Sequence, residues 1–238
     1  MSILTYPTAI KAFAKRLTDN LLPPSCLLCG ADSDNGLICS GCHADLPAPP
    51  PQHCPLCGDQ TTHGERCGAC LKDPPHFDRT IAAFRYEFPA DRLIHALKYG
   101  HQLAVADWCA VQLLPLLTDH RFDRLVPLPL HPDRLRERGF NQSAEIARAV
   151  GARLHTPVDV SVMQRTRATL PQADLPPKER RRNVRGVFEC RGDLSGQHLL
   201  LIDDVMTTGS TVNECARTLK IHGAASVTVA VVARALKL

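Results

Sequence analysis

Cysteine spacing is the feature that most restricts how this chain can fold. Eight of its eleven cysteines lie between positions 26 and 70, where the spacing C-x2-C-x9-C-x2-C occurs twice, the second copy 28 residues after the first. A C-x2-C turn directs two thiolates to one tetrahedral zinc ion, and a second turn completes the four ligands. The sequence therefore predicts two structural Zn2+ sites, with the ligands Cys26, Cys29, Cys39 and Cys42 and the ligands Cys54, Cys57, Cys67 and Cys70.

The spacing leaves the pairing of the C-x2-C turns open, because in-order and cross-braced coordination use the same cysteines. A thioredoxin-like redox motif is disfavoured, since it needs a single C-x2-C beside a βαβ unit. The four motifs here lie in a segment that holds nine of the nineteen prolines. That segment has too few large apolar side chains to build a core, so metal binding is expected to supply its folding free energy.

The remaining composition suggests three parts. Residues 1–22 are predicted to form an N-terminal helix, residues 23–76 a double zinc ribbon, and residues 77–238 an α/β domain. No apolar run approaches the ~20 residues of a membrane helix, and residues 1–22 lack the apolar stretch of a secretion signal. We therefore expect a cytoplasmic protein with no membrane span, where reducing conditions favour zinc over disulfides.

From about residue 77 onward, apolar periodicity alternates between that of strands and that of helices. Strands are predicted over residues 80–86, 124–130, 198–202 and 226–233, and helices over residues 91–99, 104–117, 141–154 and 210–222. Strands that alternate with helices predict a mostly parallel sheet flanked by helices.

The most informative segment is an apolar strand that ends at Ile202 and leads into two acids, a loop and a helix. In a parallel sheet such a loop lies where α/β proteins bind ligands, and the free N–H groups of a helix start suit a phosphate. Adjacent buried acids are costly without a ligand or ion, and they suit ribose hydroxyls directly or through Mg2+. We expect a ribose 5-phosphate group to be bound by Asp203, Asp204, Thr207, Thr208, Gly209, Ser210 and Thr211.

Basic side chains elsewhere suit a pyrophosphate, because arginine binds phosphate oxygens with two parallel hydrogen bonds. Residues 165–191 contain eight basic and three acidic side chains, in a stretch that could close over a polyanion. The alternative is that residues 178–182 form a solvated helical face. The candidates for this role are Arg134, Arg138, Asn141, Arg165 and Lys178.

Residues 199–211 closely resemble the motif with which type I phosphoribosyltransferases bind 5-phosphoribosyl-1-pyrophosphate (PRPP). Together with the paired C-x2-C motifs and the runs at residues 97–99, 138–142 and 165–167, they resemble the ComF family of ComFC- and GntX-like proteins. The resemblance implies a type I phosphoribosyltransferase fold behind a double zinc ribbon, PRPP bound with Mg2+, and a role in natural competence and DNA utilisation. Its implied partners are single-stranded DNA and competence-machinery proteins such as a ComFA-like helicase.

Two functions remain open at this point. The chain could transfer phosphoribosyl from PRPP to an acceptor with release of pyrophosphate, or it could be a non-catalytic single-stranded-DNA-binding competence factor that uses the PRPP site for regulation or anchoring. Aromatic residues make up only 5% of the chain, which argues against a DNA binder that relies on stacking. Transferases for 6-oxopurines carry an aspartate where this chain has Thr207, so that substrate class is disfavoured and the catalytic base stays unknown.

Overall fold

The computed structural model describes residues 25–34, 36–167 and 184–236. The chain divides into two compact units, residues 1–46 and residues 47–238, and the boundary falls between the two cysteine motifs. The predicted helix over residues 1–22 and the candidate Lys178 lie outside the described residues. Across the described ranges, no helix combines the length and the apolar character needed to cross a membrane.

The described part of the first unit is a small ribbon that ends in helix α2 (Ser40–Ala44). Backbone hydrogen bonds from Cys26 N to Ala31 O (2.6 Å) and from Leu27 N to Leu37 O (3.0 Å) hold its first turn. Gly30 follows the second cysteine with φ +76°, a conformation that a side chain disfavours. The chain can therefore turn back sharply beside the four thiols.

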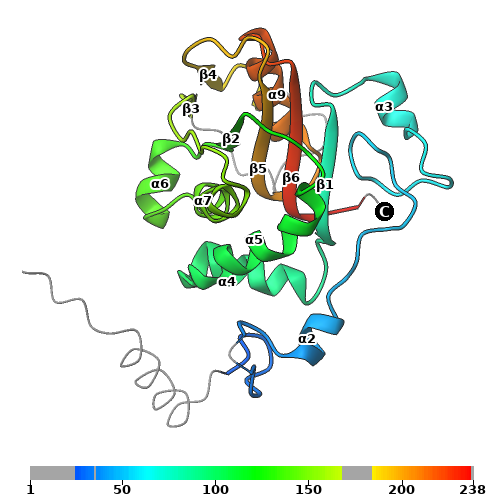
Figure 1. The fold of residues 1–238 in the computed structure, drawn as a ribbon, viewed down its shortest axis with the longest axis vertical. Helices are drawn as coiled ribbons and strands as arrows, with labels where there is room; N and C mark the ends of the chain where they lie inside the picture. Colours follow the sequence, from blue (N-terminus) through cyan, green and yellow to red (C-terminus); the bar gives the residue numbers. More distant parts are fainter. Residues whose placement is uncertain (1–24, 35, 168–183, 237–238) are drawn as a thin grey trace, which may run out of the picture. The chain divides into compact units, whose positions relative to one another are not determined.

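The second unit is built on a four-stranded parallel sheet with the order β1-β6-β5-β2, whose strands lie side by side in Figure 1. All four predicted strands are confirmed. The strands are β1 (Arg79–Arg85), β2 (Arg124–Pro127), β5 (His198–Met206) and β6 (Ser226–Arg234). Strand β5 is four residues longer than predicted, because its pairing with β6 continues to Met206.

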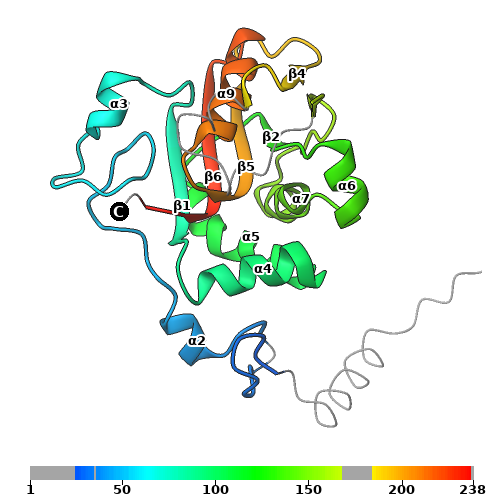
Figure 2. The same cartoon turned by 180° about the vertical axis from the view of Figure 1, so that it is seen from behind.

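Helices cover the sheet, and the predicted ones are confirmed as α4 (Ala90–Gly100), α5 (Ala104–Leu117), α7 (Gln142–Leu154) and α9 (Ser210–Ile221). Helix α5 contacts α4, α7 and β1, and α7 packs on β2 and β5. Helix α9 packs on β5 and β6, beside which it appears in Figure 2. The carboxyl ends of β2 and β5 therefore open into loops that lead directly into helices.

The short elements beside the sheet were not predicted from periodicity. Helix α6 (Pro132–Arg138) has only seven residues, and β3 (Met163–Arg165) and β4 (Phe188–Cys190) form an antiparallel pair of three residues each. Elements this short contain too little of a repeat to be read from the sequence.

The second cysteine motif belongs to the same unit as the sheet and contains helix α3 (Gly68–Lys72). Cys54, Cys57 and Cys70 are part of one buried cluster with Phe77 and with Val229 of β6. This ribbon is therefore packed into the core of the unit that contains the sheet rather than folded by itself.

Candidate functional site

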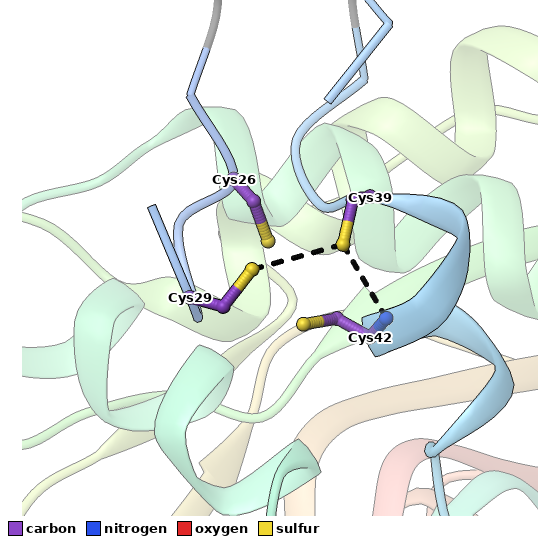
Figure 3. Close-up of side chains that lie close together, drawn as sticks. All are labelled: Cys26, Cys29, Cys39 and Cys42. Carbon is purple, nitrogen blue, oxygen red and sulfur yellow. Dashed lines mark hydrogen bonds between the residues drawn. The ribbon is translucent and has the colours of Figure 1, made fainter. Parts of the chain in front are cut away.

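The first cluster of thiols joins Cys26, Cys29, Cys39 and Cys42, whose sulfur atoms all lie within 4.8 Å of one another. Figure 3 shows the four sulfurs turned toward a common centre, and Cys29 Sγ lies 3.8 Å from Cys39 Sγ. Four sulfurs around a tetrahedral zinc at ~2.3 Å would be about 3.8 Å apart. The geometry fits Zn2+, and the ligands are four consecutive cysteines, so coordination is in order rather than cross-braced.

The second cluster repeats this arrangement with Cys54, Cys57, Cys67 and Cys70. Cys57 Sγ lies 3.6 Å from Cys67 Sγ. Burial would raise the pKa of the Cys54 thiol, but backbone N–H groups, among them that of Cys57, lower it to about 7. Similar N–H groups lower the pKa of Cys26 to about 6. In both clusters the first cysteine is thus readily present as the thiolate that zinc binds.

The two acids predicted to bind ribose lie inside β5, not beyond its end, and both are buried. Asp203 Oδ1 accepts hydrogen bonds from Ser143 Oγ and from the Asp204 backbone N–H, both at 2.9 Å. Asp204 Oδ2 forms an ion pair with Lys98 Nζ at 2.8 Å. Neighbouring residues of a strand point to opposite sides, which explains why the two carboxylates have different partners.

Burial, and then the adjacent Asp204 carboxylate, raise the pKa of Asp203 to about 7, although Lys98 and Ser143 oppose this shift. Burial also disfavours the charged form of Lys98, but Asp204 and Asp203 outweigh it and raise the pKa of Lys98. One carboxylate is therefore neutralised by a lysine, and the other can gain or lose a proton near neutral pH.

The loop that follows β5 turns at Gly209, which has φ +77° and precedes the first residue of α9. A Cβ at this glycine would lie 3.2 Å from Met206 Cε, so the turn has little room for a larger residue. Thr208 Oγ1 and Ser210 Oγ are 2.9 Å apart. Two small hollows lie at the start of α9. The first is lined by Thr208, Gly209 and Ser210. The second is lined by Gly209 and Ser210 together with Asp203, Thr207 and Thr211.

The four described pyrophosphate candidates lie around the carboxyl ends of β2 and β3. Arg134 and Arg138 are on α6, and Arg138 Nη1 donates to Gln142 Oε1 at 2.6 Å. Arg165 on β3 lies near enough to Asp203 and Arg134 for their charges to affect its pKa, which burial lowers. Asn141 instead serves the fold, because its amide donates to Leu128 O (3.0 Å) and its carbonyl oxygen accepts from the N–H of Ser143 (3.0 Å).

A partly exposed aromatic and cationic patch lies next to the acids. It consists of His95, Lys98, Tyr99, Arg134 and Arg138, which we call the Tyr99 patch. The Tyr99 ring lies 4.7 Å from the His95 ring and 5.4 Å from the guanidinium of Arg138. All members of the patch except His95 also line a cavity of about 280 Å³.

A larger cavity of about 720 Å³ lies beside the α7 N-terminus and β3, with Asn141, Arg148 and Arg165 in its walls. Its size is that of a small-molecule site.

Sequence reasoning missed the roles of Lys98 and Ser143. Lys98 stands in the run at residues 97–99, and its pairing with Asp204 spans more than a hundred residues of chain. Ser143 is 60 residues from Asp203. The only signal available in the sequence was that two adjacent buried acids need partners.

Two family models match separate parts of the chain. Residues 17–71 match the family model "Double zinc ribbon domain". Residues 138–237 match the model "Phosphoribosyl transferase domain".

Relatives cover most of the chain. It is 36% identical over 173 residues to the DNA utilization protein YhgH of Escherichia coli (strain K12), covering 70% of this chain and 76% of that one. It is 30% identical over 175 residues to Competence protein F of Haemophilus influenzae, covering 69% and 76%. Among solved structures, a purine phosphoribosyltransferase from Pyrococcus horikoshii Ot3 aligns with 54% of this chain and 71% of that one. The sequence identity is 19% and the TM-score is 0.36, so this alignment carries no information about the substrate.

Proposed function

The chain belongs to the ComF family of competence and DNA-utilisation proteins, and on this premise we propose that it binds PRPP at the carboxyl end of β5 and transfers the phosphoribosyl group to an acceptor. One observation carries the proposal. Two buried carboxylates, a loop of hydroxyl and glycine residues, and a helix N-terminus follow one another along a single strand–loop–helix unit. This order suits a ribose diol and its 5-phosphate.

Each part of the unit has a distinct task. Asp203 and Asp204 accept hydrogen bonds from the ribose hydroxyls or bind the Mg2+ that accompanies them, since Mg2+ prefers oxygen ligands. Thr208 and Ser210 donate their hydroxyl hydrogens to the 5-phosphate, together with the free N–H groups of α9. Lys98 and Ser143 hold the two carboxylates in place before the ligand arrives.

In the transfer, the bond between ribose C1 and the pyrophosphate oxygen breaks, and its electron pair leaves with pyrophosphate. A nucleophilic atom of the acceptor forms the new bond to C1 and gives up a proton. Bound Mg2+ would neutralise part of the charge on the leaving group. Arg134, Arg138 and Arg165 supply fixed positive charge for the same purpose.

Calorimetric titration with PRPP and Mg2+ tests the proposal. Thr208→Val and Asp203→Asn each remove a hydrogen bond to a charged group, which should cost ~1.5 to 3 kcal/mol or about ten- to a hundredfold in affinity. Thr118→Val, on an exposed threonine after α5, is the matched control and should bind as the wild type does. A wild-type protein that shows no binding, or site variants that bind equally well, would refute it.

Transfer itself is tested by pyrophosphate release. Labelled PRPP is incubated with a panel of bases, amines and DNA ends, and the rate with each is compared with the rate of PRPP hydrolysis. Residues 178–182 can be tested in the same assay, because a role of Lys178 in closing over pyrophosphate predicts that Lys178→Ala lowers PRPP affinity.

A second candidate function, binding of single-stranded DNA, is favoured by the Tyr99 patch. An exposed aromatic ring beside a histidine and an arginine is suited to stack on a base, and the exposed Arg134 suits a phosphate backbone. In this function PRPP would be a regulatory or anchoring ligand instead of a substrate.

The two candidates can be separated at the patch. Tyr99→Ala should weaken binding of a single-stranded oligonucleotide by about 1 to 3 kcal/mol, and Arg138→Ala should lower the slope of log K against log salt by ~0.7. Arg121→Ala is the control, because Arg121 is exposed and precedes β2 at the amino ends of the strands. If Arg138→Ala and Arg121→Ala have the same effect, the Tyr99 patch takes no part in DNA binding.

A further inference from the structure

Arg234, the last residue of β6, connects the second zinc ribbon to the loop after β5. Its side chain is buried, with 2% of its surface exposed. Nε donates to the carbonyl oxygen of Cys57 at 2.8 Å. Nη1 donates to the carbonyl oxygens of Met206 (3.2 Å) and Thr207 (2.5 Å), and also to that of Ala235. One guanidinium thus bonds both to the backbone of a zinc ligand and to the backbone of the predicted phosphate loop.

The ribbon and the loop also share a surface. Cys57, Ala69 and Cys70 of the ribbon line the same small hollow as Thr208, Gly209 and Ser210 of the loop. A second link lies just beyond the ribbon, where the N–H of His76 donates to Asn213 Oδ1 on α9 at 2.6 Å. The second ribbon therefore forms one side of a hollow whose other side is the predicted phosphate loop.

The contact between Arg234 and the Cys57 carbonyl is expected to depend on zinc binding at the second ribbon. The ribbon has few large apolar side chains of its own, so although its cysteines pack on the core, zinc is expected to supply much of the free energy that holds it in place. If the ribbon loosened, Arg234 would lose its Cys57 acceptor while remaining a buried cation, which is a costly state. Its remaining bonds to Met206 and Thr207 would then be free to shift, and the loop with them.

We propose that the second zinc site is a positioning element for the phosphate loop, with Arg234 as the positioning residue between them. Occupancy of this zinc site sets the affinity of the loop for the 5-phosphate of PRPP, whereas occupancy of the first zinc site does not. The proposal rests on the proposed function for its ligand, but the contact between ribbon and loop exists without it.

Equivalent cysteines of the two ribbons give a matched test, because Cys42 and Cys70 are the fourth ligands of their motifs. Cys42→Ser and Cys70→Ser should each lose one of two zinc ions. We expect Cys70→Ser to weaken PRPP binding at least tenfold and to speed hydrogen exchange at residues 207–211. Cys42→Ser should change neither. A folded Cys70→Ser protein with one zinc and wild-type affinity and exchange would overturn the proposal, as would equal losses in both variants.

Arg234→Lys provides a test that leaves all eight thiols in place. A lysine keeps the charge but cannot reach the Cys57 and Met206 carbonyls together. We expect two zinc ions, PRPP affinity lowered about tenfold, and faster exchange at residues 207–211. Unchanged exchange with two zinc ions would contradict the proposal even if Cys70→Ser does not fold.

The exchange measurements separate the two hypotheses. If the wild type binds no PRPP, the proposed function fails, and exchange at residues 207–211 still decides whether the second zinc site holds the loop.

Discussion

The two zinc ribbons have the same ligand spacing and different surroundings. In the first, Cys29 is exposed and only Cys26 is buried, whereas in the second Cys67 alone is not buried. The first lies in the compact unit of residues 1–46, and the second lies in the unit that contains the sheet. Ligand spacing therefore determines which metal is bound, but the neighbours determine what the metal stabilises.

The difference begins at the proline-rich linker of residues 47–51. The carbonyl oxygen of Pro47 accepts a hydrogen bond from the N–H of Arg85 at the end of β1 (2.8 Å). From this point the chain follows the sheet, and the second ribbon meets apolar residues such as Phe77 that can bury its cysteines. A duplicated motif has thus been given two different structural environments.

Removal of one ligand from each site should have the largest effect. Cys54→Ser removes a fully buried ligand of the sheet unit, so we expect loss of one zinc and a fall of more than about 4 kcal/mol in the free energy of unfolding of residues 47–238. Cys26→Ser, at the equivalent position, should change that free energy by less than about 0.5 kcal/mol. Scanning calorimetry with zinc analysis measures both, and equal falls would break the comparison.

Zinc release should show a smaller difference between the ribbons. A chelator needs a thiol to become accessible, which in the second ribbon requires opening of a packed core. We expect two phases in a colorimetric chelation assay, with the slow phase roughly tenfold slower or more. Cys42→Ser should retain only the slow phase. A single rate for both ions in the wild type would show that burial does not protect the second site.

A change of pH separates the contribution of the acids from that of the ribbon. The pKa of Asp203 is raised to about 7 from 3.8, so the folded state holds this proton more tightly than the unfolded state. Asp203 therefore lowers stability as pH rises between about 4 and 7, while its ionised form becomes available to ribose hydroxyls. PRPP affinity should rise about tenfold from pH 6 to pH 8.

Calorimetric titration at the two pH values checks this expectation. Asp203→Asn, which cannot ionise, should lose the dependence and keep both zinc ions. A pH dependence that persists in this variant, or that follows zinc content instead, would assign the effect to the ribbon.

The smallest effect is expected at the glycines that follow the second cysteine of each motif. Gly30 and Gly58 have φ +76° and +69°, so an alanine at either position should cost ~1 kcal/mol in its own unit. A Cβ at Gly58 would lie 3.8 Å from Cγ of Arg234, whereas a Cβ at Gly30 would have no neighbour within 4 Å. Chemical denaturation followed in the sheet unit should detect Gly58→Ala only, and a fall with Gly30→Ala would contradict the comparison.

The sequence was sufficient to predict those features of the fold and the site whose signal is local. The two sets of four cysteines, the four sheet strands and the main helices follow from spacing and periodicity, and the structure confirms them. The extension of β5 through Asp203 and Asp204 was not predicted, because acids interrupt an apolar run and look like its end. Pairing with β6 extends the strand through both acids to Met206.

What the sequence could not show are contacts between distant segments. Lys98 reaches Asp204 across the fold, and Arg234 reaches a carbonyl of Cys57. An arginine at the end of a valine-rich strand looks like an ordinary exposed terminal residue. Its burial depends on a ribbon that precedes it by 177 positions, so no short-range pattern could predict it.

The bonds of Arg234 to Met206 and Thr207 have a consequence for the peptide planes of the loop. In a trans peptide the N–H points away from the C=O of the same plane. Because these two carbonyls are turned toward the interior cation, the N–H groups of Thr207 and Thr208 are directed away from it. The buried guanidinium therefore aligns two peptide dipoles whose positive ends point away from it, which is the orientation that the proposed 5-phosphate site requires.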